Sequence, residues 1–526
     1  MAEQYNQPTV PGIDRKRIAL VNGYIGSGKR IRIEGQVVDV SILTDHNKEA
    51  WDPFIGLPLS QLRRIRPVQD MGMSAVRKPR ISVQLVPWPS EWDRAMPEHL
   101  EELAVPEAIQ EGPEIHGEED GFFAVELPGE ALPGKYLVRI MLRGSDSIRQ
   151  SFTDIARIGA GIQQMNQTDT AIGFGRAIIL PEDYEGTMVT SDIDQTFLDT
   201  KIESRQGLLN TLMELPDMKK PLAGMEELYR VLAGHGYSLS FISASPHFFR
   251  RTLMSVFSRH SIPVDSLHLK YLMGTLNQMV RKTVQTVLNM DDYLSQGFTE
   301  ALDRSMKFMG SSLQSLFDQV GYKLETLLRM RVHRPTGARE VLMGDDTESD
   351  YFIFTFYQCI LLGWIHGDRL QQYLYRLQFK DREALTRDAA RNIVALAERN
   401  LQTHGAINPV EAVWINRAAS NTTDAMRKEI EDSLPSQWDQ KPDFEQIRFP
   451  EACEGAAGFA MHAVETGYLK IEEAVRFLHE LEGKILKEKK LDAERIDTII
   501  SECHVSEEEK KKLHAALREH RSTHQK

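Results

Sequence analysis

GTMVTSDID (Gly186–Asp194) is the first of four apolar stretches that decide the fold of this chain. The others are YSLSFISAS (Tyr237–Ser245), SLHLKYL (Ser266–Leu272) and REVLMGDD (Arg339–Asp346). Each is long enough for one strand, and segments with a helical pattern separate them. Strands that alternate with helices form a parallel sheet. The sequence therefore predicts an α/β domain with a parallel sheet over residues 186–372.

Three further parts surround these strands. Upstream, alternating β-branched and aromatic residues between Gly and Pro turns predict a β-sandwich-like domain over residues 1–185. Between the third and fourth strands, apolar residues recur at helical spacing and predict a helical, cap-like insertion over residues 271–320. Residues 373–526 favour a helical region, in which Asn408-Pro409 is typical of a helix start. The strands predicted upstream are Arg30–Val40, Arg80–Trp88, Gly121–Pro128 and Lys135–Gly144.

Composition and charge exclude several classes of function. A chain of 526 residues, with 41% hydrophobic and 26% charged residues, is ordinary for a globular protein of about three domains. The net charge of −13 argues against broad nucleic-acid binding, which needs a positive surface. Three scattered cysteines fit a reducing compartment and provide no zinc site.

The chain also lacks the patterns of secretion and membrane insertion. Its first residues show no basic start followed by an apolar stretch, so we expect no signal peptide. The most apolar run, Tyr351–Ile365, is shorter than the roughly 20 residues that a bilayer span needs, which predicts a buried helix. We therefore expect a cytoplasmic protein with no transmembrane segment, and any contact that it makes with a membrane should be peripheral.

Polar residues gather where the predicted strands end. The first strand runs into TSDIDQT, the second ends at Ser243, and the fourth runs into GDDTESD, with Lys323 just before it. DxDxT alone is a weak motif, since a strand-ending turn with a capping Asp also produces it. Together, however, the four pieces occur in the order that phosphoryl transfer requires, at the sheet edge where ligands bind. The expected site residues are Asp192, Asp194, Thr196, Ser243, Lys323, Asp345, Asp346 and Asp350.

The motifs and their order resemble the haloacid dehalogenase superfamily. SDIDQT, followed by PLAGMEELYRVLAGHGYSLSFISASPHFF, LHL, a lysine and VLMGDDTESDYF, resembles the catalytic domain of the actin-patch-type phosphatidate phosphatase family. The resemblance covers roughly residues 18 to 365. Gln195 is a departure, because the family usually has a third Asp at this position. The resemblance implies a haloacid dehalogenase-like phosphatase domain that acts on a phosphate ester, with phosphatidate, a phospholipid, as one candidate.

The resemblance also implies a role for each site residue. Asp192 would attack phosphorus and form an aspartyl-phosphate, while Asp194 would protonate the leaving oxygen and then activate water. Ser243 and Lys323 would bind the phosphoryl oxygens, and Thr196 would order the loop. Carboxylates approach a phosphate only with a cation between them, and Mg²⁺ favours oxygen ligands. Its ligands would be Asp192, the Asp194 carbonyl and Asp345, with Asp346 or Asp350 holding coordinated waters.

Two other functions remain open at this stage. The first is a phosphatase of the same fold that hydrolyses a soluble phosphate ester. The second is a catalytically inactive scaffold, in which the β-sandwich and the C-terminal helices recruit partners. Metal-dependent hydrolysis separates the enzymes from the scaffold, and a comparison of phosphatidate with soluble esters separates the two enzymes.

Overall fold

The computed structural model describes the chain in segments, which together include all the predicted site residues. These segments are residues 13–43, 51–52, 57–58, 74–88, 107–143, 170–200, 219–270, 319–377, 385–488, 493–502 and 506–524. The predicted insertion, residues 271–320, lies outside the described residues except for its last two, which open a helix.

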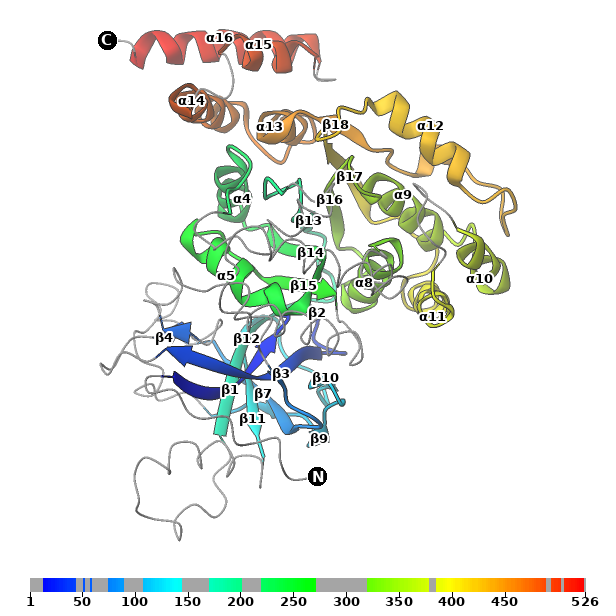
Figure 1. The fold of residues 1–526 in the computed structure, drawn as a ribbon. Coiled ribbons are helices and arrows are strands. Elements are labelled where there is room, and N and C mark those ends of the chain that lie inside the picture. Colours follow the sequence, from blue (N-terminus) through cyan, green and yellow to red (C-terminus); the bar gives the residue numbers. More distant parts are fainter. Residues whose placement is uncertain are drawn as a thin grey trace, which may run out of the picture.

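The N-terminal part contains two main sheets (Figure 1). In one, the strand order is β1-β3-β10, with β6 beside β3; in the other it is β2-β12-β11-β7-β8, with β9 beside β7. One cluster of buried apolar side chains draws on both sheets, for example Val37 and Val138, so the sheets share a core. The predicted strands are confirmed as β3, β7, β10 and β11. The strands are β1 (Ile13–Val21), β2 (Tyr24–Ser27), β3 (Arg32–Leu43), β4 (Trp51–Asp52), β5 (Leu57–Pro58), β6 (Ser74–Ala75), β7 (Arg80–Pro87), β8 (Gln110–Glu111), β9 (Ile115–His116), β10 (Phe122–Glu126), β11 (Gly134–Leu142) and β12 (Thr170–Leu180).

A parallel sheet forms the centre of the remaining chain. Its order is β15-β14-β13-β16-β17-β18, and every neighbouring pair is parallel. Because all these strands point the same way, their carboxyl ends lie along one edge. The predicted parallel α/β class is therefore confirmed. The strands are β13 (Thr187–Asp192), β14 (Ser238–Pro246), β15 (Ser266–Lys270), β16 (Arg339–Asp345), β17 (Val410–Asn416) and β18 (Glu451–Cys453).

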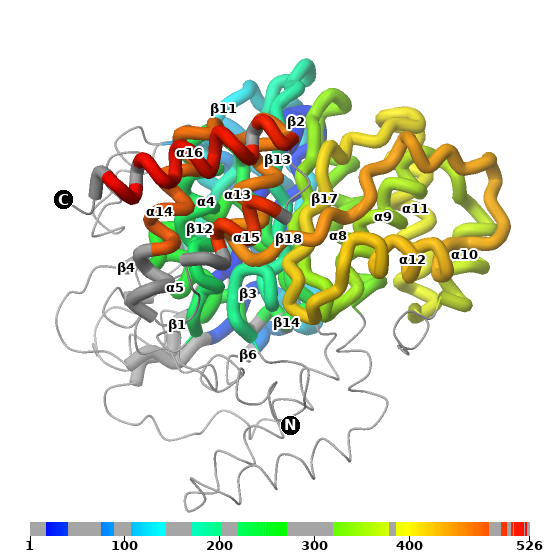
Figure 2. Tube along the Cα trace, turned by 90° about the horizontal axis from the view of Figure 1, so that it is seen from above, coloured from blue at the N-terminus to red at the C-terminus, as the bar shows by residue number. Residues whose placement is uncertain are grey.

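Helices cover both faces of this sheet (Figures 1 and 2). Alternation along β16 shows the two faces, because Val341 and Met343 belong to one buried cluster and Leu342 to the other. The first cluster includes side chains of α4, α5 and α13 to α16, and the second those of α8 to α12. The helices are α4 (Met225–Gly234), α5 (Arg250–Arg259), α8 (Gln319–His333), α9 (Asp350–Leu361), α10 (Gly367–Arg376), α11 (Arg387–His404), α12 (Thr423–Ser433), α13 (Gly455–Glu465), α14 (Ile471–Glu488), α15 (Ala493–Glu502) and α16 (Glu507–His524), with short 3₁₀ turns at His247–Phe249 and Phe444–Gln446.

The expectation of a helical region over residues 373–526 was partly wrong, because this region also supplies β17 and β18 to the parallel sheet. Asn408-Pro409 precedes a strand, not a helix. The Asn408 side chain accepts a hydrogen bond from the Val410 backbone N–H at 3.1 Å, which turns the chain into β17. Nearly all of β17 is buried, as suits an inner strand of a covered parallel sheet.

The most apolar run of the chain is a buried helix, as predicted. Every residue of α9 is buried, including the polar Thr355 and Gln358. Their side chains bond to the backbone oxygens of Tyr351 and Phe354 one turn earlier. Within the part of the chain that the structure describes, no helix is both long and apolar enough to cross a membrane.

The N-terminal sheets and the parallel sheet are in direct contact. The Leu267 backbone N–H of β15 donates to the Asn22 carbonyl at 2.8 Å. Gly23 adopts a left-handed φ of 83°, and a Cβ there would lie 2.3 Å from the Asp265 carbonyl oxygen, so only glycine fits. Arg329 of α8 also reaches Glu34 of β3, with Nε 3.6 Å from Oε2. The helix that carries Lys323 is therefore linked to the N-terminal part.

Candidate active site

Asp192 lies at the carboxyl end of the central strand β13, whose six residues are all buried. Its own exposed fraction is 2%. On α8, across the site, the Lys323 ammonium nitrogen is 2.7 Å from Asp192 Oδ1. The structure thus brings together two residues that are 131 positions apart and that the sequence predicted as neighbours.

Lys323 is the cationic centre of a cluster of carboxylates. Besides Asp192, it contacts Asp350 Oδ1 at 2.6 Å and Glu348 Oε2 at 3.1 Å. Burial alone would lower its pKa, but the charges of Asp192, Asp350, Glu348 and Asp345 outweigh burial and raise the pKa well above its usual value. Lys323 is therefore a permanent cation at neutral pH.

The carboxylates around Lys323 carry more negative charge than one lysine can neutralise. Burial raises the pKa of Asp192 well above its usual value, and the charges of Asp350, Glu348 and Asp345 add to that effect while Lys323 opposes it. Burial followed by the charge of Glu348 likewise raises the pKa of Asp345. Four carboxylates share one ammonium group, so the site has an excess of negative charge that a divalent cation would neutralise.

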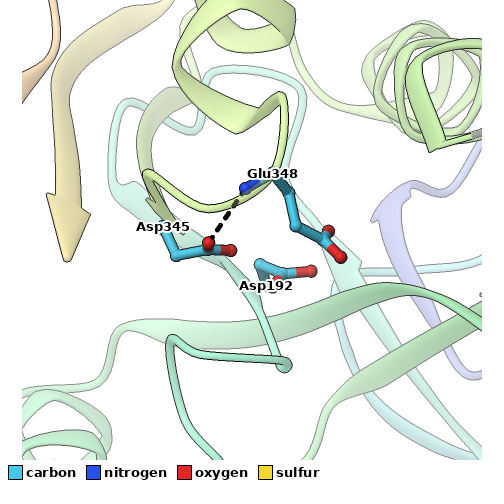
Figure 3. A group of neighbouring side chains, drawn as sticks. All are labelled: Asp192, Asp345 and Glu348. Carbon is cyan, nitrogen blue, oxygen red and sulfur yellow. Dashed lines mark hydrogen bonds between the residues drawn. The ribbon is translucent and has the colours of Figure 1, made fainter. Parts of the chain in front are cut away.

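Asp192, Asp345 and Glu348 form a group suited to a metal ion (Figure 3). Each offers one carboxylate oxygen, and these three atoms lie within 4.8 Å of one another. Asp345 is oriented by its own loop, because its Oδ1 accepts hydrogen bonds from the backbone N–H groups of Thr347 (2.7 Å) and Glu348 (3.2 Å).

Buried oxygens without hydrogen bonds support this fit. Apart from the charge contact with Lys323, neither Asp192 oxygen has a hydrogen-bond partner among the described residues, and neither does Asp345 Oδ2. Buried polar atoms are rarely left so, and carboxylate oxygens are the ligands that Mg²⁺ prefers. The donor set therefore fits the ion that the sequence predicted.

The other two predicted acidic residues, Asp350 and Asp346, lie outside this group of three and have other partners. Asp350 is bound to Lys323, and its Oδ2 also accepts the Asp345 backbone N–H at 3.4 Å. That approach requires Gly344, because a Cβ there would lie 2.5 Å from Asp350 Oδ2. Asp346 accepts the backbone N–H groups of Ala419 (2.6 Å) and Asn421 (2.7 Å) in the loop after β17.

Glu348 was missed at the sequence level. GDDTESD contains four acidic residues in six positions after its glycine, and spacing alone does not tell which of them face Asp192. The start of α9 at Asp350 decides the matter, because it turns Glu348 toward Asp192 and Lys323. The Gln319 side chain on α8 holds the second Glu348 oxygen.

Asp194 faces two serine hydroxyls from β14. Its Oδ2 accepts hydrogen bonds from Ser243 Oγ at 3.0 Å and from Ser245 Oγ at 3.1 Å. Burial, followed by the charge of Glu348, raises the pKa of Asp194. A raised pKa favours the protonated form, which a general acid needs at neutral pH. Ser245, within the same ISASP motif as Ser243, was not predicted as a site residue.

The loop from Asp192 to Thr196 is tightly folded. Gln195 has a left-handed φ of 55°, which is uncommon for a residue other than glycine. The backbone N–H groups of Phe197 and Leu198 both donate to the Ile193 carbonyl at 2.9 Å. Thr196 is fully buried, and its hydroxyl has no partner among the described residues. Thr196 therefore belongs to the packed inner side of the loop.

Comparison with protein families supports the resemblance seen in the sequence. Residues 187–296 match the family model described as "Phosphatidate phosphatase APP1, catalytic domain". The predicted resemblance is confirmed. The matched segment begins with β13 and includes Asp192, Asp194, Thr196 and Ser243. The matched family is one of phosphatidate phosphatases, which are phosphoric monoester hydrolases, as predicted.

Comparisons with whole proteins add little. No curated protein matches the chain. Among solved structures, a Bacteroides ovatus GH5 xyloglucanase in complex with a XXXG heptasaccharide covers 90% of this chain and 92% of its own. It has 7% sequence identity and a TM-score of 0.15.

Proposed function

We propose that this chain is a Mg²⁺-dependent phosphatidate phosphatase that forms an aspartyl-phosphate on Asp192. The observation that carries the proposal is the buried contact of Lys323 with Asp192 at the carboxyl edge of a parallel sheet, within a group of acidic residues. Phosphoryl transfer depends mainly on positioning and on neutralising charge, and this arrangement provides both. The family match over residues 187–296 supports the substrate.

The proposal includes a haloacid dehalogenase-like arrangement of the parallel sheet. Its support is that the sequence motifs of that superfamily fall on β13, β14, α8 and β16, with their polar residues near one another. The proposal also takes the two N-terminal sheets as a β-sandwich, which the core that they share supports.

Asp192, Asp345 and Glu348 would hold the Mg²⁺ ion, together with the Asp194 backbone carbonyl that the family resemblance adds. When bound, the ion would neutralise phosphate and carboxylate charge. Glu348 enters this set because its carboxylate lies with those of Asp192 and Asp345. The sequence had given a supporting place to Asp346 or Asp350; Asp346 accepts two N–H groups of the loop after β17, and Asp350, like Glu348, contacts Lys323.

In the first step, an Asp192 carboxylate oxygen attacks phosphorus, and the bond from phosphorus to the ester oxygen breaks. Asp194 donates its proton to that leaving oxygen, which departs as an alcohol. Burial favours the protonated acid before this step. Lys323 and Ser243 would hold the phosphoryl oxygens, and the positive charge of Lys323 opposes the rise in the Asp192 pKa that burial causes.

In the second step, water attacks phosphorus and the bond to Asp192 breaks. Asp194, now ionised, takes a proton from the attacking water, which restores both carboxyl groups and releases inorganic phosphate. Ser245 keeps Asp194 in place for both proton transfers, since its hydroxyl donates to Asp194 Oδ2. The Ser243 hydroxyl makes the same hydrogen bond in the structure and would turn to the phosphoryl oxygen when substrate binds.

The substrate is tested with a panel of phosphate esters. Wild-type chain and Asp192→Asn chain, purified identically, are compared on phosphatidate in mixed micelles, glycerol 3-phosphate and 4-nitrophenyl phosphate. We expect wild-type kcat/KM to be highest on phosphatidate, with no activity above background in the variant. Hydrolysis of the soluble esters alone would favour the soluble-ester phosphatase, and no hydrolysis at all would favour the scaffold.

This proposal also gives the protein a cytoplasmic location and a peripheral contact with the membrane that carries its substrate. An intracellular site suits the two described cysteines, which are free and buried. Binding to phosphatidate-containing vesicles, followed by sedimentation, would measure the membrane contact.

The ligand set makes a prediction about metal binding. EDTA should abolish activity, and Mg²⁺ should restore it. Glu348→Gln should weaken Mn²⁺ binding, measured by calorimetry, by roughly ten- to a hundredfold, because an anionic oxygen is lost. Glu454→Gln, at the same sheet edge but outside the group, is the control. Unchanged Mn²⁺ affinity in Glu348→Gln would remove Glu348 from the ligand set.

A further inference from the structure

Asn416 is the last residue of β17 and lies at the edge of the sheet that carries the site. In register it pairs with Asp345 on one side and with Cys453 on the other. It is 7% exposed and lies outside the segment that matches the phosphatase family. Its place beside a proposed metal ligand raises the question of what its side chain does.

Both ends of the Asn416 amide are occupied. Nδ2 donates to the Gln195 backbone carbonyl at 2.5 Å, and Oδ1 accepts the Gly455 backbone N–H at 3.2 Å. The Asn416 backbone carbonyl in turn accepts the Asp346 N–H at 3.1 Å. One side chain must both donate and accept here, which an amide does and a carboxylate does not.

The bond to Gln195 acts on the loop that carries the two catalytic aspartates. Gln195 follows Asp194 directly and has the left-handed backbone noted above, a conformation that persists only where the surroundings hold it. The Asn416 amide fixes the carbonyl of this residue, and the Gln195 side chain bonds to the Thr200 carbonyl. Asn416 thereby limits how the peptide after Asp194 can rotate.

We infer that Asn416 is a positioning residue for Asp194, which it keeps aligned with the leaving oxygen of the substrate. The inference rests on the proposed function and deepens it: β17, from a part of the chain predicted as helical, completes the acid side of the site. Both polar atoms of the Asn416 side chain are bonded to backbone groups, so Asn416 acts through the Gln195 carbonyl.

The test compares leaving groups. Asn416→Asp is nearly isosteric but does not donate to the Gln195 carbonyl. The quantity compared is kcat/KM, which covers the steps up to release of the alcohol and leaves out the second step, where Asp194 acts as a base for both substrates. On dioctanoyl phosphatidate, whose alkoxide needs a proton to leave, kcat/KM should fall by roughly tenfold or more. On 4-nitrophenyl phosphate, whose phenolate leaves without a proton, kcat/KM should fall by less than about twofold. Because each substrate is compared with wild type, differences in lipid binding cancel.

Asn408→Asp is the matched control at the opposite end of β17. Asn408 Nδ2 donates to the Gln446 carbonyl at 2.9 Å, and its Oδ1 accepts the Val410 N–H, so this variant loses a comparable donor away from the site. It should show no dependence on the leaving group. Asn416→Ala removes the same hydrogen bond without adding charge, and it gives the same comparison if Asn416→Asp does not fold.

Equal losses on both substrates in the folded Asn416 variants, or no loss on either, would overturn the inference and leave the proposed function intact. Failure of the proposed function would look different, because wild type itself would hydrolyse neither ester, or only 4-nitrophenyl phosphate.

Discussion

Asp192→Asn should lower the rate of phosphatidate hydrolysis by about 10⁴-fold or more, because it removes the attacking charge and keeps the shape. The same change should leave stability unchanged or raise it. Asp192 is buried beside other carboxylates, and removing one negative charge relieves their repulsion. Turnover in single-substrate assays and thermal melting in EDTA measure the two effects.

The control is Asp199→Asn, which makes the same chemical change at an exposed position of the same loop. It should change neither turnover nor melting temperature beyond a small surface effect. Wild-type-like turnover in Asp192→Asn would show that another group attacks phosphorus. A large drop in its melting temperature would show that Asp192 is chiefly structural.

Lys323→Met should abolish activity and also destabilise the protein by roughly 3–5 kcal/mol in EDTA, because it leaves buried carboxylates without their cation. Methionine keeps the length of the side chain, so the loss reflects charge more than volume. Mg²⁺ should recover part of the stability, since it neutralises the same carboxylates, but not the activity. Urea unfolding with and without Mg²⁺ measures this difference.

Lys428→Met, an exposed lysine on α12, is the matched control, and it should lose little stability. If Lys323→Met were as stable as wild type in EDTA, the carboxylates would not depend on Lys323 for compensation. Stability should stay level or rise in Asp192→Asn and fall in Lys323→Met. A loss of packing would lower stability in both variants, so this contrast separates the effect of charge from that of packing.

The central strands were predictable because their residues are of one kind. β13, β14, β15 and β16 are apolar runs of five to nine residues that end in polar residues, and their short length and the helical segments between them favour covered parallel strands over buried helices. VEAVWIN, which forms β17, is equally apolar, but Asn408-Pro409 before it is compatible with either a turn or a helix start. Its partner β16 lies about 70 residues upstream, and a pairing over that distance produces no pattern in the residues around β17.

The site residues, too, were predictable only where a local sequence motif contains them. Asp192, Ser243 and Lys323 were predictable because each follows or precedes a strand in a recognisable motif. Glu348 was not, because which acidic residue of GDDTESD faces inward depends on where α9 begins. Asn416 was not, because its partner Gln195 is 221 positions away and one asparagine carries no pattern. Sequence motifs thus identified residues that the structure brings together, but not the residues from other parts of the chain that contact them.

The order of strands in the sheet has a consequence for synthesis. Asp192 leaves the ribosome well before Asn416 and Gly455, and the stretch from Lys323 to Gly455 takes roughly 10 s to translate at ordinary rates. For the part of that time between completion of β16 at Asp345 and completion of β17 at Asn416, β16 has no β17 beside it and presents an unpaired strand edge, which can pair with other extended chains. A growing chain therefore contains Asp192 and Lys323, the proposed nucleophile and its cation, before it contains Asn416, and the edge of β16 stays open to other strands until β17 is made.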